Sequence, residues 1–315
     1  MPSSHITIER LAADAEPAAL RSAFGLVLRT LPPTTALDLA TTTMFAARRD
    51  AAAFGKLWGA YDANGALRGA IWAQLRPGNV AVVWPPQWID SSDVAPSLPD
   101  PLLEALIGAL RRSGVLLAQS LLPDVECQEA RTLLAGGFEH LAELTYLSAD
   151  VAPQASPTPR DDAPAELRFV AYSPADRARL TALVDRSYEG TLDCPALNGT
   201  RPTSEVLDEY EAIGTIGTRG WFFVRRQEAD VGCLLLADHP QLDQVELVYM
   251  ALLPKARGCG WGEVITRASL RIAGDFGRAR VVLAVDAANT PAAAHYRRAG
   301  FRTWETRSAF VCKLA

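Results

Sequence analysis

The stretch "LLPKARGCGWG", residues 252–262, decides the fold. The apolar run "QVELVYMALL" leads into it and indicates a strand, and "GEVITRASLRIAGDFG" leaves it with apolar residues at helical spacing. Gly258, Gly260 and Gly262 alternate with other residues at this junction. A glycine-rich turn between a strand and a helix suits anionic phosphate, because backbone N–H groups converge there and glycine allows close approach. The stretch therefore predicts a phosphate-binding loop, with an ordinary tight turn as the alternative.

The glycine spacing narrows the kind of phosphate site. R-G-x-G-x-G differs from G-x-x-x-x-G-K-[ST] of nucleoside-triphosphate loops and from G-x-G-x-x-G of dinucleotide-binding folds. Both of these classes are therefore disfavoured.

Strand-like and helix-like segments alternate on both sides of "ADVAPQASPTPRDDAPAE", residues 149–166. This segment is rich in Pro, Ala and Asp and has no apolar period, which predicts an exposed linker. "LRGAIWAQL" follows a turn at Asn64-Gly65 and indicates a hairpin, and "NTPAAAHYRRAG" indicates a helix that Asn289 opens and Gly300 closes. The pattern predicts mixed α/β layers in two domains, residues 1–150 and 166–315, joined by the linker 151–165.

The two halves repeat one order of elements. The sequence of residues 123–147 aligns without gaps with that of residues 286–310. This alignment pairs Ala130 with Ala293, Gly137 with Gly300, and Phe138 with Phe301. Together with the shared order, these matches predict an internal duplication.

"VELVYMALLPKARGCGWGEV" followed by "NTPAAAHYRRAGF" resembles the GNAT superfamily of acetyl-CoA-dependent N-acetyltransferases. The first stretch is similar to its acyl-CoA-binding motif, with Lys255 where Gln or Arg is more usual. The second is similar to its C-terminal signature, an Asn followed by a helix that carries Tyr and ends in Gly-Phe. The motifs cover residues 244–301, and the strand order extends the resemblance to residues 167–315. Two tandem GNAT-type domains, each with a mostly antiparallel sheet between helices, would resemble the layout of mycothiol synthases.

The resemblance implies a transferase (EC 2.3.1.-) that uses acetyl-CoA as co-substrate. Amides of the glycine loop would hold the pyrophosphate, Lys255 and Arg257 would add positive charge, and main-chain groups at the end of the strand would bind pantetheine and the acetyl carbonyl. Asn289 would help to hold the pantetheine arm. The implied cofactor-binding residues are Met250, Ala251, Leu252, Lys255, Arg257, Gly258, Cys259, Gly260, Trp261, Gly262 and Asn289.

Amine acetylation requires a base for the incoming ammonium and an acid for the departing thiolate. Glu246 lies on the central strand, where several GNAT enzymes carry the base; the alternative is a glutamate with only a structural hydrogen bond. Tyr296 lies where the family points a hydroxyl at the coenzyme A sulfur; the alternative is a packing aromatic. His295 would point about 100° away around the helix. Cys259 would contribute only its backbone.

The first half lacks these features. Leu133 stands where Tyr296 would be, and Glu126 stands where Asn289 would be. "WPPQWIDSSDVAPSLPD" replaces the glycine loop, and Pro85 and Pro86 remove two N–H donors where a phosphate would need them. We therefore expect a degenerate domain without an acetyl-CoA site.

The segment "SYEGTLDCPALNGTRP", residues 187–202, would cover the acceptor site in a GNAT fold. Glu189, Asp193 and Asn198 would then bind a cationic or polyhydroxylated amine, either a small molecule or a peptide. The alternative is a loop whose polar groups satisfy only its own backbone.

Composition limits the remaining possibilities. The chain has 315 residues, a net charge of −5 and no basic tract, which argues against a nucleic-acid partner. Its five cysteines are scattered without C-x-x-C spacing, so we expect neither a disulfide framework nor a metal. The polar start and the lack of a long apolar window predict a cytoplasmic protein without a membrane span. We expect a monomer or a homodimer. The two functions that remain are an acetyltransferase and a non-enzymatic acetyl-CoA-binding or sensor module.

Overall fold

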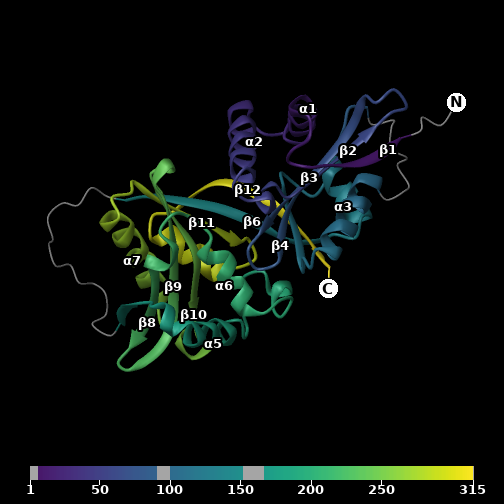
Figure 1. Cartoon of the computed structure of the whole chain (residues 1–315). Coiled ribbons are helices and arrows are strands. Elements are labelled where there is room, and N and C mark those ends of the chain that lie inside the picture. Colours follow the sequence, from purple (N-terminus) through teal and green to yellow (C-terminus); the bar gives the residue numbers. More distant parts are fainter. Residues whose placement is uncertain (1–5, 91–99, 152–166, 315) are drawn as a thin grey trace. The chain divides into compact units, whose positions relative to one another are not determined.

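The computed structural model describes residues 6–90, 100–151 and 167–314, which divide into two units (Figure 1). The first unit holds the residues up to 141 together with the C-terminal segment from 308, and the second unit holds residues 142–307. The sequence-predicted linker, residues 151–165, lies outside the described residues except for Val151.

The first unit is a sheet with helices on both faces. Its strands follow the order β1-β2-β3-β4-β5, and residues 308–313 of β12 pair with β5. Only the β4–β5 pair is parallel among these. The elements are β1 (Thr7–Leu11), α1 (Pro17–Val27), α2 (Pro33–Ala47), β2 (Lys56–Tyr61), β3 (Leu67–Arg76), β4 (Val80–Trp88), α3 (Pro101–Arg112), β5 (Leu117–Leu122), α4 (Gln128–Ala135) and β12 (Arg302–Lys313).

The second unit repeats this arrangement. Its strands follow the order β6-β11-β10-β9-β8-β7, and β10 and β11 form the parallel pair. The elements are β6 (Glu139–Asp150), β7 (Leu167–Ala171), α5 (Arg177–Ser187), α6 (Thr203–Glu211), β8 (Gly220–Arg226), β9 (Ala229–His239), β10 (Gln244–Leu252), α7 (Trp261–Asp275), β11 (Arg280–Asp286) and α8 (Thr290–Arg298). The prediction of two mixed, mostly antiparallel α/β repeats is therefore confirmed.

The last strand of each half pairs with the sheet built by the other half. In the second unit, β6 lies against β11, with Leu144 opposite Asp286 and Asp150 opposite Arg280. In the first unit, β12 lies against β5, with Ser308 opposite Leu122. The predicted bounds, residues 1–150 and 166–315, place β6 in the first domain and β12 in the second, whereas the structure pairs β6 with β11 and β12 with β5.

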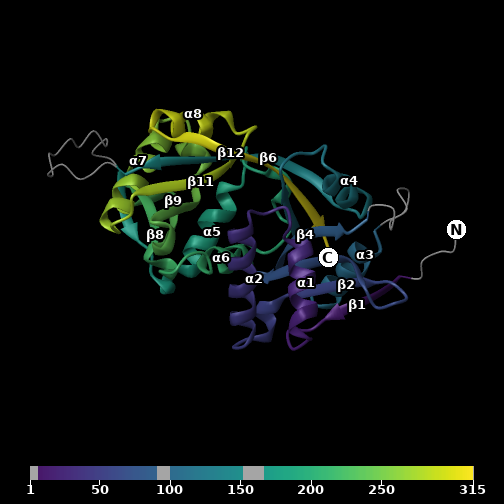
Figure 2. The same ribbon diagram turned by 90° about the horizontal axis from the view of Figure 1, so that it is seen from above.

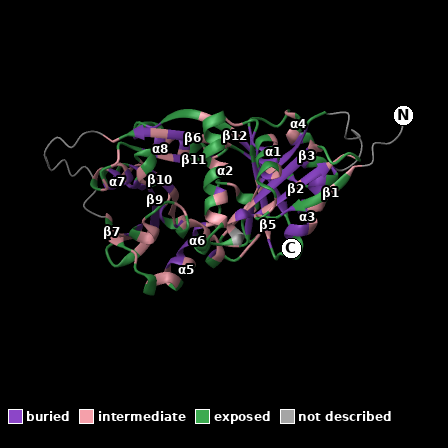
Figure 3. Cartoon of the chain, turned by 45° about the horizontal axis from the view of Figure 1, so that its top comes forward, coloured by how far each residue is buried: buried purple, intermediate pink, exposed green. Residues whose placement is uncertain are grey.

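Two layers of helices flank the second sheet (Figure 2). Helices α7 and α8 pack on one face, and α5 and α6 pack on the other, each over its own apolar cluster (Figure 3). Along β10, Val245 and Leu247 face α7, whereas Tyr249 and Ala251 face α5, because a bulge at Val248 shifts the alternation. This bulge lies just beyond the last residue pair that joins β10 to β11, Glu246–Val282.

The turn between β2 and β3 has the conformation that its sequence, Asn64-Gly65, predicts. The carboxylate of Asp62 accepts hydrogen bonds from the backbone N–H groups of Asn64 and Ala66, at 2.9 and 3.0 Å. Gly65 has φ +76°, which glycine adopts without strain. The β2–β3 hairpin at Asn64-Gly65 is therefore confirmed.

Candidate active site

A cavity opens where β10 and β11 separate. The two strands pair only through Gln244–Arg280, Val245–Val281 and Glu246–Val282, although both continue beyond these pairs. The cavity has a volume of 670 Å³ and is lined by residues 247–252 of β10, the end of β11, the glycine loop, α8 and the segment 190–193. This volume lies within the usual range of ligand sites, about 300–1,000 Å³.

The glycine loop borders one part of this cavity with bare backbone. Gly258 and Gly260 have φ values of +76° and +78°, and a Cβ atom added to either would meet no protein atom within 4 Å. Gly260 is also the N-cap of α7, whose first N–H groups have no partner within the helix. Open space, free amides and a helix N-terminus together suit a pyrophosphate.

The side chains of this loop take several directions. Gly258, Gly260, Gly262 and Arg257 line the cavity, whereas Lys255, Cys259 and Trp261 are absent from its lining. Trp261 is buried, and the guanidinium of Arg226 lies 5.2 Å from its ring. Lys255 and Cys259 are exposed. Any cofactor contact of these three residues would therefore come from backbone groups or from the exposed side chain of Lys255.

The guanidinium of Arg257 connects the glycine loop with the segment that follows α5. Its Nη2 donates to the carbonyl of Ser187 at 2.7 Å, and its Nη1 donates to the carbonyls of Glu189 and Gly190 at 2.7 and 3.0 Å. Its Nε donates to the carbonyl of Leu252 at 3.1 Å. Arg257 thus satisfies carbonyl groups that the end of a helix leaves without partners.

Tyr296 and Asn289 reach the cavity from α8. Tyr296 is only 6% exposed, and burial, followed by the charge of Asp193, raises the pKa of its hydroxyl above the ordinary value. The side chain of Asn289 caps α8 by accepting a hydrogen bond from the N–H of Ala292 at 3.3 Å. Tyr296, the predicted acid, and Asn289, the residue predicted to hold pantetheine, therefore lie together on the side of the cavity that α8 forms.

Glu246 lies apart from the cavity lining. Its side chain alternates with Val245 and Leu247 and so faces the α5 side of the sheet, opposite α8. Its Oε2 lies 2.9 Å from Nε2 of His239, and this hydrogen bond is the main cause of the raised pKa of His239. Glu246 and Tyr296 therefore lie on opposite faces of the sheet at the point where β10 and β11 separate.

Of the three sequence-predicted acceptor residues, only Asp193 lines the cavity. Its Oδ1 accepts a hydrogen bond from the N–H of Asp286 at 2.9 Å. Desolvation by the surrounding protein atoms raises the pKa of Asp193, and the negative charge of Asp286 adds to the rise. The hydrogen bonds from the backbone of Asp286 and from the side-chain amide of Asn289 oppose it. Glu189 engages Arg257 through its carbonyl, and the amide of Asn198 donates to the carbonyl of Tyr188 at 3.4 Å.

Sequence reasoning missed several lining residues. His295 borders the cavity next to Gly262, where an added Cβ would lie 3.0 Å from its Nδ1. Burial lowers the pKa of His295 to about 4, so its imidazole is neutral at neutral pH. Arg298 also lines the cavity, and its Nε bonds Glu263 at 2.9 Å. The angle of about 100° between neighbouring residues on a helix leads to the prediction that His295 points away from the site of Tyr296. In the structure, where α8 packs against α7, both side chains border the cavity.

The first unit differs at the equivalent place. Counted from the first parallel pair of each unit (Val80–Leu117 and Gln244–Arg280), Gln87 and Trp88 correspond to Ala251 and Leu252. Both are buried. The amide of Gln87 accepts from Arg29 at 2.8 Å and donates to Glu129 at 3.1 Å, and Nε1 of Trp88 donates to Asp100 at 2.7 Å.

Pro85 and Pro86 continue strand β4 and are buried. Much of the stretch that replaces the glycine loop, residues 91–99, lies outside the described residues.

The residues that the structure describes contain neither a cluster of metal ligands nor a membrane-spanning helix. No group of three or more His, Cys, Asp and Glu side chains there could hold a metal ion. No helix within the same residues is long and apolar enough to cross a bilayer.

Comparison with known proteins supports these observations. Residues 187–301 match the family described as Acetyltransferase (GNAT). A mycothiol acetyltransferase from Pseudarthrobacter chlorophenolicus is 42% identical over 67 residues, which cover 21% of this chain and 20% of that protein. One from Streptomyces bingchenggensis is 37% identical over 87 residues, 28% of each chain. The chain thus matches only a fifth to about a quarter of the length of these relatives.

Solved structures match over nearly the whole chain. A GCN5-related N-acetyltransferase from Sphaerobacter thermophilus has a TM-score of 0.63 at 13% identity, covering 98% of this chain and 96% of its own. A tandem GNAT protein from the clavulanic acid biosynthesis pathway has a TM-score of 0.52 at 16% identity, covering 99% of both chains. At these identities the likeness concerns the fold, which is that of a tandem repeat.

Proposed function

Because residues 187–301 match the acetyltransferase (GNAT) family, we propose that the chain is an acetyl-CoA-dependent N-acetyltransferase that transfers the acetyl group directly to an amine. One observation carries the proposal: a single cavity between β10 and β11 borders the open glycine loop, Tyr296 and Asp193. A cofactor, an acid and an acceptor would all meet there.

The glycine loop would bind the pyrophosphate of acetyl-CoA through amides of residues 257–262. Lys255 would add charge from its exposed position, whereas the guanidinium of Arg257 already bonds four carbonyls. Met250, Ala251, Leu252 and Asn289 would hold pantetheine and the acetyl carbonyl. A backbone N–H aimed at that oxygen would stabilise the charge that develops on it.

Tyr296 would act as general acid. As the amine nitrogen attacks the acetyl carbon, the carbon–sulfur bond breaks, and the hydroxyl of Tyr296 would give its proton to the departing thiolate. A phenol with a raised pKa holds that proton at neutral pH. The nitrogen, which still carries one proton more than the amide product, would release it to bulk water, and water would return a proton to Tyr296 after product release.

Glu246 would act as general base for the acceptor ammonium. Its carboxylate lies on the face of the sheet opposite Tyr296, so the two proton transfers would take place on opposite sides of the thioester. Because Glu246 does not line the cavity, a bridging water would carry the proton to it.

Asp193 would bind the acceptor. Its carboxylate opens to the cavity near Tyr296, where it would pair with a cationic amine. Glu189 and Asn198 would contact larger, polyhydroxylated or peptide acceptors from the outer part of the loop.

The roles of the two domains follow from the comparison between the two repeats. Residues 166–315 would be the catalytic repeat, and residues 1–150 would be a degenerate repeat in which Gln87 and Trp88 fill the position of the cofactor strand. Residues 151–165 would connect the two.

One observation favours a second function, a non-enzymatic acetyl-CoA-binding module. Glu246 lies outside the cavity lining and is already bonded to His239. A structural Glu246 would leave the cofactor site intact without a base.

A panel of amines separates the two functions. The full chain is incubated with acetyl-CoA and each amine, and release of free coenzyme A thiol is measured beside acetyl-CoA binding by calorimetry. Thiol release that depends on one amine class and on Tyr296 supports the transferase. Acetyl-CoA binding without thiol release over small amines, lysine peptides and peptide N-termini would favour the binding module.

A further inference from the structure

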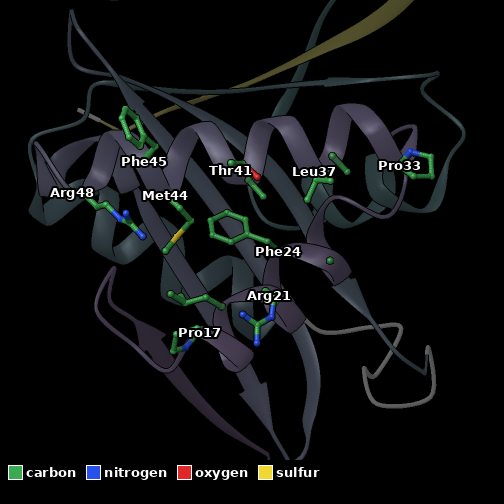
Figure 4. A pocket seen from close by; sticks show the side chains of 13 residues that line it. Pro17, Arg21, Phe24, Pro33, Leu37, Thr41, Met44, Phe45 and Arg48 are labelled. Atoms are coloured by element: carbon green, nitrogen blue, oxygen red, sulfur yellow. The ribbon is translucent and has the colours of Figure 1, made fainter.

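The first unit contains a cavity between α1 and α2 that the proposed reaction does not use (Figure 4). Its volume is 690 Å³, which is within the range of small-molecule sites, about 300–1,000 Å³. Figure 4 shows Phe24 and Met44 at its centre, with Arg21 extending from α1 and Arg48 from the end of α2. Most of its remaining wall is apolar, including Leu20, Ala36, Ala40 and Phe45.

The cavity exists because the two helices are anchored differently. Helix α1 is fixed on the sheet: Phe24 is 3% exposed, and its ring meets that of Trp72 edge-on at 5.1 Å. Helix α2 has one buried residue, Thr43, and touches the same apolar cluster through half-buried side chains such as Met44. A gap therefore remains between the helices, with an apolar base.

The outer edge of the cavity is also apolar. Leu37 and Phe45 are 67% and 56% exposed, and their spacing of eight residues places them on one side of α2. Large exposed apolar side chains beside a cavity indicate a surface that contacts something apolar.

Among the residues that the structure describes, Arg21 and Arg48 are the only ionisable ones that line the cavity. Within the part of the chain that the structure describes, neither guanidinium has an ion-pair or hydrogen-bond partner. The neighbouring Arg49 differs, because its guanidinium lies 4.9 Å from the ring centre of Phe45 and it does not line the cavity. An apolar site whose charges are all positive and uncompensated favours a ligand with an apolar body and an anionic group.

We propose that this cavity binds a small amphipathic carboxylate. The alkyl or aryl body would lie against Phe24 and Met44, and the carboxylate would pair with Arg21 or Arg48. A concave wall suits a small molecule better than a second copy of the chain, since a stable interface buries about 1,200–2,000 Å² and only two large apolar side chains project here. The net charge of −5 disfavours an anionic membrane surface.

The test is calorimetric titration of the full chain, saturated with acetyl-CoA so that the other cavity is filled. The probes are decanoate, decyltrimethylammonium and acetate, which separate the contributions of the apolar body and the charge. We expect decanoate to bind at least about tenfold more tightly than the other two. Arg21→Gln combined with Arg48→Gln should remove most of this preference, and Arg49→Gln, the matched control, should not.

A second variant tests the cavity itself. Ala40→Trp fills the space between the helices, so it should abolish decanoate binding while the melting temperature stays near that of the wild type. If Ala40→Trp unfolds the chain, the arginine variants decide, because both side chains are exposed and make no hydrogen bond or ion pair within the described residues.

Several results would overturn the proposal. These are equal affinity for the cationic probe, no binding of decanoate, unchanged binding in the double arginine variant, and an equal loss in Arg49→Gln. Cosedimentation with anionic vesicles in the absence of decanoate binding would assign the site to a membrane surface instead. If the chain forms dimers that Phe45→Ser dissociates, and decanoate does not bind, the cavity would be assigned to contact with a second copy of the chain.

Discussion

At the scale of single residues, the hydroxyl of Tyr296 decides whether the cavity is catalytic. Tyr296→Phe keeps the ring and removes only the proton donor, so kcat should fall by about 10²–10⁴-fold. Acetyl-CoA affinity should change little, because the ring contacts with Phe301 at 5.8 Å remain. Steady-state kinetics and calorimetry measure the two effects.

The pH profile gives a further check on Tyr296. Since burial raises the pKa of its hydroxyl, kcat of the wild type should show no loss from phenol ionisation below about pH 10, the ordinary pKa of tyrosine. Wild-type kcat in Tyr296→Phe on a verified amine would remove the acid role.

Glu246 should show the opposite dependence on pH. Glu246→Gln should lose most activity near neutral pH, where the acceptor is an ammonium, and recover as rising pH supplies the free amine. The bond to His239 strengthens this expectation, because it fixes the carboxylate in place. His239→Gln is the matched control, since it loosens Glu246 without removing it and should cause a smaller defect. A loss in Glu246→Gln that does not change with pH would leave Glu246 only a positioning role.

At the scale of elements, Arg257 makes the cofactor loop and the acceptor segment one structure. Arg257→Gln would leave the carbonyls of Ser187, Glu189 and Gly190 without their donor. Hydrogen exchange over residues 187–199 should therefore accelerate, and the KM for the acceptor should rise more than that for acetyl-CoA. Lys255→Gln, the control, should weaken acetyl-CoA and leave exchange unchanged. Unaltered exchange in Arg257→Gln would contradict the connection.

Elements with strong local signals could be predicted, and those fixed by distant packing could not. Strand β10, the glycine loop and α8 follow from apolar period, glycine placement and the Asn289 cap. Helix α2 was not predicted, because "PPTTALDLATTTMFAA" combines prolines and threonines with apolar residues on several sides. The bulge at Val248 and the true direction of the Arg257 side chain leave no trace in sequence spacing, because both depend on neighbours from other segments.

Among the acceptor residues, Asp193 lines the cavity, whereas Glu189 and Asn198 do not. The sequence located the segment through its polar composition, but loop conformation decides which side chain turns inward. Cys194, with φ +42°, is part of that conformation and has no sequence signal.

At the scale of the whole molecule, one acetyl-CoA should bind per chain. The second unit has an open glycine loop, whereas buried Gln87 and Trp88 occupy the corresponding strand in the first. Gly260→Val should abolish binding, because φ +78° strains a branched residue and the new side chain enters the cofactor space. Gln87→Ala should leave the stoichiometry of one unchanged. Calorimetry that finds two sites, or binding that survives Gly260→Val, would contradict this assignment.

The exchanged strands β6 and β12 make the two repeats depend on each other. Residues 166–315 alone would expose the β11 edge that β6 covers and would carry Phe310, fully buried in the first unit, without its sheet. Residues 1–150 alone would lack the strand beside β5. Each fragment should therefore be insoluble by itself, and co-expression should restore a soluble pair that purifies together and binds acetyl-CoA. The tandem gene would then be a case of obligate reciprocal complementation, in which neither copy can be lost while the other survives.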